Sequence, residues 1–403
     1  MKLEINSTKL DKTILDFVTK YRNKIFVIII TILALWIRNS FRGYTSGDLV
    51  LHLIPWCEYA ESHGGFLALA KNPPANDYPI TYQYILAFLT YLPASYLAKI
   101  KVVSVIFDFV SAFFVGLFVK KIGSYTKQSI VPYLAYAVTL FVPTIIMNSA
   151  AWGQRDILYT TFVIIALYCF SEEKYSLAFI MYGMAFSLKL QAVFVLPLFL
   201  FLYLKTKKFS ILNFLWIPVV YFVVYIPALF LGKPLSDIFT AYSTQVGEYK
   251  STVLNFGNIY NLLPNNYELF SKAGIIMTIV VLALVFFYLL SKDKSEIDTK
   301  LLVDLAFVSV MICAYLLPAM HERYMFAADV LGVIYLFAHK DKPYIPILVW
   351  FINASGYVTY LFAFGPWVDN KYLALIYLGV IVLVIKGIID TTKKKPQVQV
   401  ISA

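Results

Sequence analysis

The sequence has few charged residues and few cysteines. Only 14% of its 403 residues are Asp, Glu, Lys or Arg, whereas about a quarter of a soluble globular protein is charged. The three cysteines are far apart and odd in number, so they predict neither a disulfide framework nor a metal site. Inverted internal repeats, which are typical of transporters, and low-complexity segments are also missing. These absences argue against a soluble enzyme and weaken the case for a transporter.

Apolar residues are present in excess. Hydrophobic residues make up 60% of the chain and the mean hydropathy is +0.74, which predicts a polytopic membrane protein. The net charge of +11 lies in short clusters between apolar runs. This pattern is typical of cytoplasmic loops beside anionic lipid, and we expect no nucleic-acid partner. The first apolar run follows a polar tail and has no cleavage site after it, so we expect a retained signal anchor.

Twelve apolar runs are candidate membrane spans, although several are shorter than the roughly 20 residues that cross the hydrocarbon. The sequence therefore predicts an all-α bundle of roughly 12 transmembrane helices in one membrane domain, residues 1–403. The predicted spans lie near residues 24–39, 101–119, 130–148, 157–171, 174–189, 190–204, 211–231, 273–290, 301–317, 323–338, 343–363 and 371–388.

The lysines and arginines predict the orientation. If the apolar segment 78–98 lies along the outer face, five basic clusters fall on the cytoplasmic side. If it crosses, those clusters are inverted and only Lys99 and Lys101 are favourably placed. We therefore expect 78–98 to be a juxtamembrane or re-entrant segment, with both termini inside. The predicted tails are 1–23 and 389–403, and the predicted extracytoplasmic loops are 40–100, which bears juxtamembrane helices, and 232–272.

Polar residues gather on the predicted outer face. They lie in the first loop, in "NSAAWGQRD" from Asn148, in "SLKLQ" between two short spans, and in "PAMHERY". Ionisable groups at membrane depth are costly, so they line a cavity or pair with one another. We expect Asp108 and Asp329, about two turns inside their helices, to be structural partners in the bundle. The remaining groups suggest a pocket between lipid and water.

Five short motifs carry a family resemblance. In chain order they are "GD" after the first span, "DYP" before an amphipathic apolar helix, "WGQRD", "KLQ" and "HER". Together they resemble the GT-C superfamily of membrane glycosyltransferases, and within it the GPI-anchor-type mannosyltransferases and their bacterial relatives. The resemblance covers roughly residues 24–335. Two features depart from related patterns. The tract is "DYPI" where the glucosyltransferases of N-glycan assembly have "DYPP", and the first acid lacks the second acid of metal-using members.

The resemblance implies an inverting transferase that moves a hexose, mannose or glucose, from a polyprenyl-phosphate donor to an acceptor hydroxyl outside the cytoplasm. It implies a glycan, lipid or protein acceptor, with membrane lipids as further partners. We expect no cofactor and favour a metal-independent reaction, with a divalent metal left open. Asp48 is the expected catalytic residue. The expected substrate-binding residues are Asp77, Tyr78, Gln154, Asp156, Lys189, Gln191, His321, Glu322 and Arg323.

The residue types fit this chemistry independently. An acceptor hydroxyl needs a positioned base, which Asp48 can be. The leaving lipid phosphate gains charge and needs cations, which Lys189, Arg323, Lys99 or Lys101 can supply. We also expect Leu49, Leu51 and Leu53 to keep the site dry and to raise the pKa of Asp48.

Each candidate also has a structural interpretation. Asp48 can cap the following helix, Asp77 can form a turn, and Lys189 can extend to the membrane interface. Asp156 can pair with the preceding arginine or cap the helix 157–171, and His321 and Glu322 can form a surface pair. His52 and His63 have no third ligand at a useful spacing for a metal.

Other functions remain open at this point. The alternatives are a secondary transporter or flippase for a lipid-linked or small polar substrate, and a non-enzymatic lipid-binding factor. The nearest enzymatic rival is a lipid-diphosphate-dependent polysaccharide ligase, which would favour more arginines than Arg323 alone. The composition, rich in Lys, Ile, Phe and Tyr, favours a bacterial cell membrane and an undecaprenyl carrier.

Overall fold

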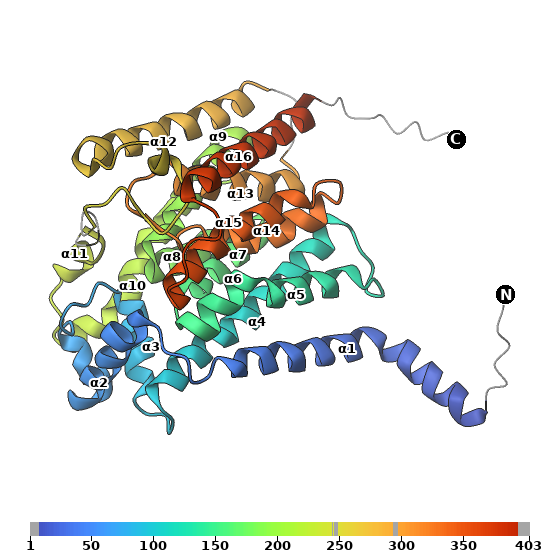
Figure 1. Cartoon of the computed structure of the whole chain (residues 1–403), viewed down its shortest axis with the longest axis horizontal. Helices are drawn as coiled ribbons and strands as arrows, with labels where there is room; N and C mark the ends of the chain where they lie inside the picture. The colour runs from blue at the N-terminus through green and yellow to red at the C-terminus, as the bar shows by residue number, and fades with distance from the viewer. Residues whose placement is uncertain (1–7, 244, 246–248, 293–296, 394–403) are drawn as a thin grey trace.

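The structure is a helical bundle with one pair of two-residue strands (Figure 1). It is a computed structural model that describes residues 8–243, 245, 249–292 and 297–393. The outer parts of both predicted tails therefore lie outside the described residues. Figure 1 shows α2 and α3 at one end of the bundle, and the start of α1 and the end of α16 at the other.

The first half of the chain forms the following elements. They are α1 (Lys9–Ser40), the π-helix η1 (Leu49–Leu53), α2 (Ile54–Ser62), the 3-10 helix η2 (Gly65–Ala70), α3 (Ile80–Leu89), α4 (Tyr96–Ile122), α5 (Val131–Phe141), α6 (Pro143–Ile146), the π-helix η3 (Met147–Trp152), α7 (Asp156–Ser171), α8 (Tyr175–Leu188), the 3-10 helix η4 (Leu190–Val195) and α9 (Leu196–Thr206).

The second half continues the bundle. Its elements are the 3-10 helix η5 (Ile211–Leu215), α10 (Trp216–Phe230), α11 (Asp237–Ser243), β1 (Val253–Leu254), the 3-10 helix η6 (Ile259–Leu262), α12 (Tyr267–Leu290), α13 (Thr299–Leu316), β2 (Met320–His321), α14 (Phe326–Ala338), α15 (Tyr344–Phe362) and α16 (Asn370–Lys393).

Seven of the described helices are long and apolar enough to cross a membrane, and a bent pair would make eight. The chain is therefore an all-α, multi-pass membrane protein. Five further apolar helices have 10–17 residues, and they occupy several of the twelve predicted runs. The run 130–148 is not one straight helix, because the chain bends by 55° between Phe141 and Pro143. Pro143 explains the break, since proline lacks the N–H that would continue the helix.

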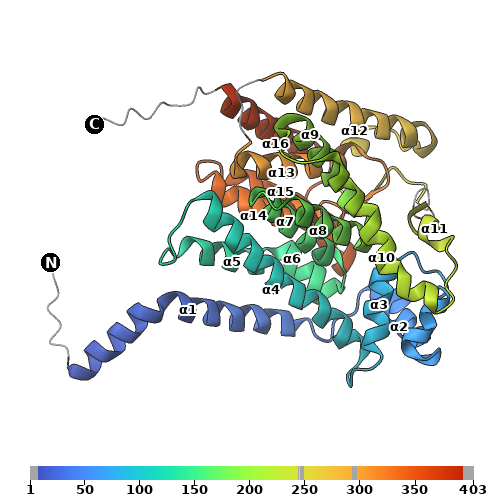
Figure 2. The same ribbon diagram turned by 180° about the vertical axis from the view of Figure 1, so that it is seen from behind.

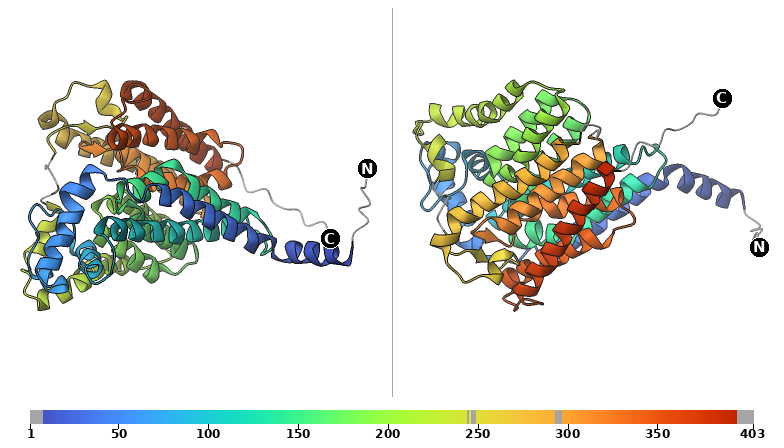
Figure 3. Two further views of the ribbon diagram at one scale, coloured as in Figure 1. Left: turned by 60° about the horizontal axis from the view of Figure 1, so that its bottom comes forward. Right: turned by 90° about the horizontal axis from the view of Figure 1, so that it is seen from above.

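The core lies around α7 and α13. Every residue of α13 from Leu301 to Leu316 is buried, and α7 is buried on nearly all sides. α7 packs against α8 and α4, and α13 packs against α14, α16 and α12. Figure 2 shows α10 crossing the outside of α8, and Figure 3 shows α12, α13 and α16 side by side. A helix that is apolar all round belongs in such an interior position.

The buried acids Asp108 and Asp329 have polar partners inside the bundle. Arg38 donates from Nε to Asp108 at 2.8 Å, and Ser149 donates to the same carboxylate oxygen at 2.5 Å. Asn353 donates to Asp329 at 2.5 Å. The expectation that Asp108 and Asp329 are structural partners is therefore confirmed. Such pairs are required because an unpaired buried charge is strongly destabilising.

Several helix ends meet at one end of the bundle, which we call the Asp48 face. It is formed by the C-terminal ends of α1, α8, α13 and α15 and by the N-terminal end of α7. The parallel pair β1–β2 joins Leu254 to His321, and so ties the segment after α11 to the "HER" motif. The opposite end of the bundle carries clusters of lysines, among them those at 205, 207 and 208 at the end of α9.

Candidate active site

Asp48 lies at the start of a helical segment that begins at Gly47 and continues into the π-helix η1. Its side chain makes no capping hydrogen bond. That role belongs to Ser46, whose hydroxyl accepts from the backbone N–H of Leu49 at 3.3 Å and donates to the carbonyl of Trp152 at 2.9 Å. The capping interpretation of Asp48 is therefore wrong. π-Helical turns are rare and often occur at functional sites, and the second one, η3, ends at Trp152.

Four side chains donate hydrogen bonds to the carboxylate of Asp48. Trp152 Nε1 and Gln154 Nε2 reach Oδ2 at 3.0 and 2.5 Å. The Arg323 guanidinium reaches the same oxygen at 2.6 Å, and the hydroxyl of Tyr360 reaches Oδ1 at 2.6 Å. The carboxylate is still 22% exposed. Asp48 is thus held in one orientation by three separate parts of the chain, with one side open.

These donors decide the pKa of Asp48. Burial raises it, but the charge of Arg323 and the hydrogen bonds from Tyr360, Arg323 and Trp152 lower it more, so that the pKa lies below the ordinary 3.8. The expectation of a raised pKa for Asp48 is therefore wrong. The expected dry surroundings are also incomplete. Leu49 and Leu53 are buried, whereas Leu51 is exposed.

The "WGQRD" segment turns sharply between η3 and α7. Gly153 has φ of +73°, a conformation that favours glycine, and a Cβ there would come within 2.9 Å of Leu49. The turn aims Gln154 at Asp48 and also lets its Oε1 accept from the hydroxyl of Tyr78 at 3.0 Å. The "DYP" and "WGQ" motifs therefore meet beside the carboxylate.

The next residue, Arg155, is a cation that the sequence analysis did not select. Its guanidinium carbon lies 3.3 Å from the ring centre of Tyr78, and one of its N–H groups donates to the carbonyl of Leu188 at 2.7 Å. The side chain is buried, and its Nε has no hydrogen-bond partner among the described residues. A buried N–H without an acceptor is unusual and calls for an explanation.

Asp156 pairs with Lys189 rather than with the preceding arginine. The other carboxylate oxygen of Asp156 accepts from Asn148 at 2.9 Å. Burial lowers the pKa of Lys189 to about 8, an effect that Asp156 opposes and that the nearby Arg323 and Arg155 strengthen. Lys189 is therefore a buried cation in reach of two others, and not a lysine extended to the membrane interface. Gln191 follows on η4, buried, with its Oε1 unpartnered among the described residues.

The "HER" motif adds two further polar groups to the Asp48 face. His321 Nε2 and Glu322 Oε2 are buried without hydrogen-bond partners among the described residues. Burial, with Arg323 and Lys189, lowers the pKa of His321 to about 3, so its imidazole is neutral. Burial raises the pKa of Glu322 to about 8, so its carboxyl is protonated at neutral pH. These residues are not a surface pair, because Glu322 is 1% exposed.

Other sequence candidates lie outside this group. The half-buried Asp77 precedes Tyr78, and its backbone carbonyl accepts from the side chain of Gln245. Lys99 donates to the carbonyl of Leu92 at 3.0 Å, and Lys101 donates to the carbonyl of Phe41 at 2.8 Å. These two lysines therefore fasten loops at the Asp48 face. Within the described residues, no three His, Cys, Asp or Glu side chains gather as a metal site.

Two site residues were missed besides Arg155. Trp152 stood in the quoted "WGQRD" motif, and its indole N–H was a usable signal because a buried indole needs an acceptor. Tyr360 lies 312 residues from Asp48 along the chain, in a helix full of aromatic residues, so the sequence held no signal for it. It stacks on Trp152 with ring centres 4.4 Å apart, which fixes both donors.

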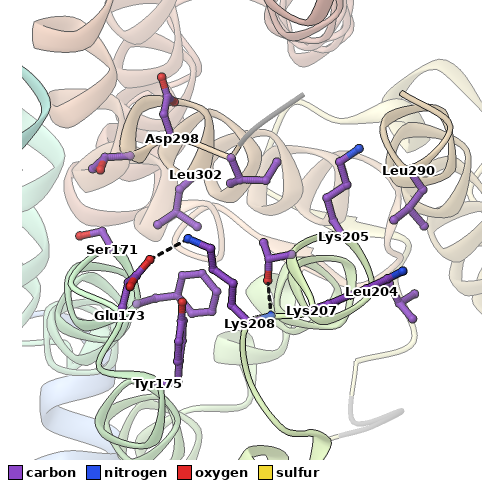
Figure 4. Close-up of a pocket in the computed structure, with 14 residues that line it drawn as sticks. Ser171, Glu173, Tyr175, Leu204, Lys205, Lys207, Lys208, Leu290, Asp298 and Leu302 are labelled. Carbon is purple, nitrogen blue, oxygen red and sulfur yellow. Dashed lines mark hydrogen bonds and ion pairs between the residues drawn. The ribbon is translucent and has the colours of Figure 1, made fainter. Parts of the chain in front are cut away.

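One cavity lies near the Asp48 face, and another lies at the opposite end of the bundle. An apolar groove of about 620 Å³ lies between η2, α3 and α10 and is lined by Phe66, Tyr84, Phe88 and Pro227 among others. A second cavity of about 870 Å³ lies at the opposite ends of α7, α9 and α13 (Figure 4). There Lys208 pairs with Glu173 at 2.7 Å.

Comparison with known proteins gives one family. The family model described as glycosyltransferase family 87 matches residues 77–338, which is more than half of the chain. The comparison with curated proteins gives no match. The matched part contains every predicted substrate-binding residue, and Asp48 and Tyr360 lie outside it. On this match, the chain belongs to glycosyltransferase family 87, a GT-C-type family of membrane glycosyltransferases.

Proposed function

We propose that this glycosyltransferase moves a hexose, mannose or glucose, from a polyprenyl phosphate to an acceptor hydroxyl, with Asp48 as the base. The acceptor is a glycan, a lipid or a protein. One observation carries the proposal. The partly exposed Asp48 carboxylate is fixed by four donors at the point where several helix ends meet, beside a group of buried cations. Family membership implies an enzyme, which sets the transporter alternative aside.

In the proposed step, Asp48 takes the proton from the acceptor hydroxyl as its oxygen attacks the anomeric carbon. The bond from that carbon to the phosphate oxygen breaks, and polyprenyl phosphate leaves with the electron pair. The attack comes from the opposite side, so the configuration inverts. A carboxylate with a low pKa is a weak base, and binding of the sugar donor is proposed to raise the pKa of Asp48. A phosphate beside Arg323 shares the positive charge that lowers the pKa of Asp48, so the pKa rises in the loaded enzyme.

The phosphate is proposed to bind Lys189, Arg323 and Arg155. The Nε groups of both arginines are buried and unpartnered among the described residues, so each has an N–H available to a phosphate oxygen. Arginine suits this role because its N–H groups form a planar fork. Hydrogen bonds to phosphate strengthen as the leaving group gains charge, which stabilises the transition state. The neutral His321, the protonated Glu322, Gln191, Asp77 and Asp156 are left to bind sugar and acceptor hydroxyls.

The donor lipid is proposed to lie in the apolar groove at Tyr84 and Pro227. The groove is almost wholly apolar and borders α3, the helix that follows Tyr78. Tyr78 donates to Gln154, which in turn donates to Asp48. A prenyl chain in the groove would therefore place its phosphate near the carboxylate.

The proposed topology has roughly twelve spans, cytoplasmic termini and the Asp48 face outside. α3 has ten residues and is about 15 Å long, which is too short for a hydrocarbon core of about 30 Å. This length supports a segment 78–98 that does not cross. The basic clusters at the opposite end of the bundle support a cytoplasmic location for that end. We place the enzyme in a bacterial cell membrane.

The test is a donor panel. Purified enzyme is incubated with polyprenyl-phosphate mannose, polyprenyl-phosphate glucose and the corresponding lipid-diphosphate sugars, with and without EDTA. We expect release or transfer of sugar from a monophosphate donor and inversion in the product. Inertness toward every monophosphate donor would contradict the proposal.

One observation favours a second candidate, the lipid-diphosphate-dependent ligase. Arg155 brings a second arginine to the site, in addition to Arg323. Three cations are enough to hold a diphosphate. In the donor panel, turnover of diphosphate donors together with inertness toward monophosphates would support the ligase and reject the monophosphate donor.

A further inference from the structure

The N-terminal turns of α1 lie apart from the rest of the protein. Every residue from Thr8 to Lys20 is exposed. Side-chain contact with the bundle begins at Arg22 and Asn23, which both donate to the carbonyl of Gln128 at 3.2 Å. Figures 1 and 2 show these first turns bending away from the direction of the remainder of α1. The segment from 9 to 21 therefore has a surface that the bundle does not cover.

The length of α1 exceeds what a membrane span requires. A helix of 32 residues is about 48 Å long at 1.5 Å per residue, whereas the hydrocarbon core is about 30 Å thick. The apolar run 24–39 accounts for the crossing. The segment 9–21 continues past it as a well-formed helix, which starts with a capping box between Thr8 and Asp11.

This segment has two unlike faces. Its apolar face recurs at the helical spacing i, i+4, i+7, i+8 and i+11 and consists of Leu10, Ile14, Phe17, Val18 and Tyr21. The side opposite carries Lys12, Asp16 and Thr19. Leu10 is 67% exposed and Phe17 is 57% exposed. Helices this short are marginal in water on their own, so the apolar face requires something to cover it.

The membrane surface is the covering that fits. The segment joins the span directly, so its C-terminal end is already at the boundary between acyl chains and water. The residues from 9 to 24 include five bases, Lys9, Lys12, Lys20, Arg22 and Lys24, against two acids, Asp11 and Asp16. An amphipathic helix with bases beside its polar face binds anionic lipid by burying the apolar face at the headgroup level.

We propose that residues 9–21 form an interfacial helix that lies on the leaflet at the N-terminal end of α1 and binds anionic phospholipid. Its apolar face enters the acyl boundary, and its lysines contact lipid phosphates. This surface is separate from the Asp48 face, so the proposal holds whatever donor the enzyme uses.

The test measures the depth of both faces in the full-length protein. Ile14→Cys and Lys12→Cys are each labelled with an environment-sensitive fluorophore and placed in nanodiscs of phosphatidylcholine with phosphatidylglycerol. The three native cysteines are buried, which favours labelling at the new site. For an interfacial helix, brominated lipid should quench the label at position 14, and aqueous iodide should quench it at least about threefold less than the label at 12.

Three results would overturn the proposal. Equal iodide quenching at both positions would mean that the helix projects into water. Cysteine cross-linking between two copies at position 14, with no quenching by brominated lipid, would mean that a second copy covers the face. Quenching that is unchanged in pure phosphatidylcholine, or in a variant with Lys9, Lys12 and Lys20 changed to Gln and the label at 14, would reject the role of anionic lipid.

Discussion

At the scale of single residues, the hydrogen bonds to Asp48 reduce its basicity and fix its orientation. Three of the four donors, Arg323, Tyr360 and Trp152, lower the pKa of this carboxylate, and a weaker base abstracts protons less readily. The same donors hold the carboxylate in place, and one of them, Arg323, also has an N–H available to a phosphate. A single arginine can thus couple donor binding to the basicity of Asp48.

The cation group is the first place to test this coupling. We predict that Lys189→Gln and Arg155→Gln each raise the KM for the lipid donor about tenfold or more, because a charge-assisted contact contributes about 1.5–3 kcal/mol. Initial rates over a range of donor concentrations measure the effect. Lys99→Gln is the matched control, since Lys99 donates to the carbonyl of Leu92. Unchanged donor dependence in the first two variants would assign the phosphate to other groups.

Glu322 predicts a pH dependence. Its raised pKa of about 8 keeps the carboxyl protonated at pH 7, and the group ionises as the pH rises through that value. The new charge lies beside Asp48 and Asp156, so activity should fall above about pH 8. Glu322→Gln imitates the protonated form. We predict near-normal activity at pH 7 and a variant-to-wild-type ratio that rises from pH 8 to pH 9.

The ratio isolates Glu322, because Lys189 titrates in the same range but is present in both proteins. A flat ratio between pH 7 and pH 9 would show that Glu322 is not the group responsible.

At the scale of elements, the turn at Gly153 positions three of the motifs. We predict that Gly153→Ala lowers both stability and turnover, because a Cβ meets Leu49 and the positive φ is strained by on the order of 1–3 kcal/mol. Thermal unfolding in detergent and donor turnover measure the two effects. Gly379→Ala in α16 is the control, since a Cβ there has open space, and it should retain activity. Equal behaviour of the two variants would contradict the role of the turn.

Hydropathy predicted which segments are helical, but it did not predict where one helix bends and where another begins. Helix occupies each of the twelve predicted runs, because apolar runs bounded by charge have few alternatives in a membrane. The bend before Pro143 was missed, although proline marked it. The start of α1 at Lys9 was also missed, because an amphipathic segment has too little hydropathy to count as a span. The motifs identified Asp48, Gln154 and Lys189 as a group.

What the sequence could not show depends on contacts between distant segments. The direction of the Asp48 pKa depends on Arg323 and Tyr360, which follow it by 275 and 312 residues. Burial alone predicts a raised pKa for Asp48, whereas the charge and hydrogen bonds of the surrounding donors lower it. Arg155 was interpreted as a partner of Asp156 because the two are adjacent, whereas the helix start directs it to the ring of Tyr78.

At the scale of the whole molecule, the proposed topology places the two ends of the bundle on different sides of the membrane. We predict that a cysteine at the exposed Lys127 resists an impermeant thiol reagent in intact cells, and that a cysteine at the exposed Lys71 is labelled. The buried native cysteines should give little background. Labelling of Lys127→Cys from outside would invert the bundle and place the Asp48 face in the cytoplasm.

We propose that the bundle as a whole holds one carboxylate, that of Asp48, against a lipid-linked sugar. Asp48→Asn tests it most directly, because this change keeps the size of the side chain and most hydrogen bonding while removing the basicity. The measurement is the rate of sugar transfer from a polyprenyl-phosphate donor that the wild-type enzyme uses, with donor binding measured in parallel. We predict a variant that folds and binds the lipid donor but transfers sugar at least about a hundredfold more slowly. Near-normal transfer by Asp48→Asn would contradict it.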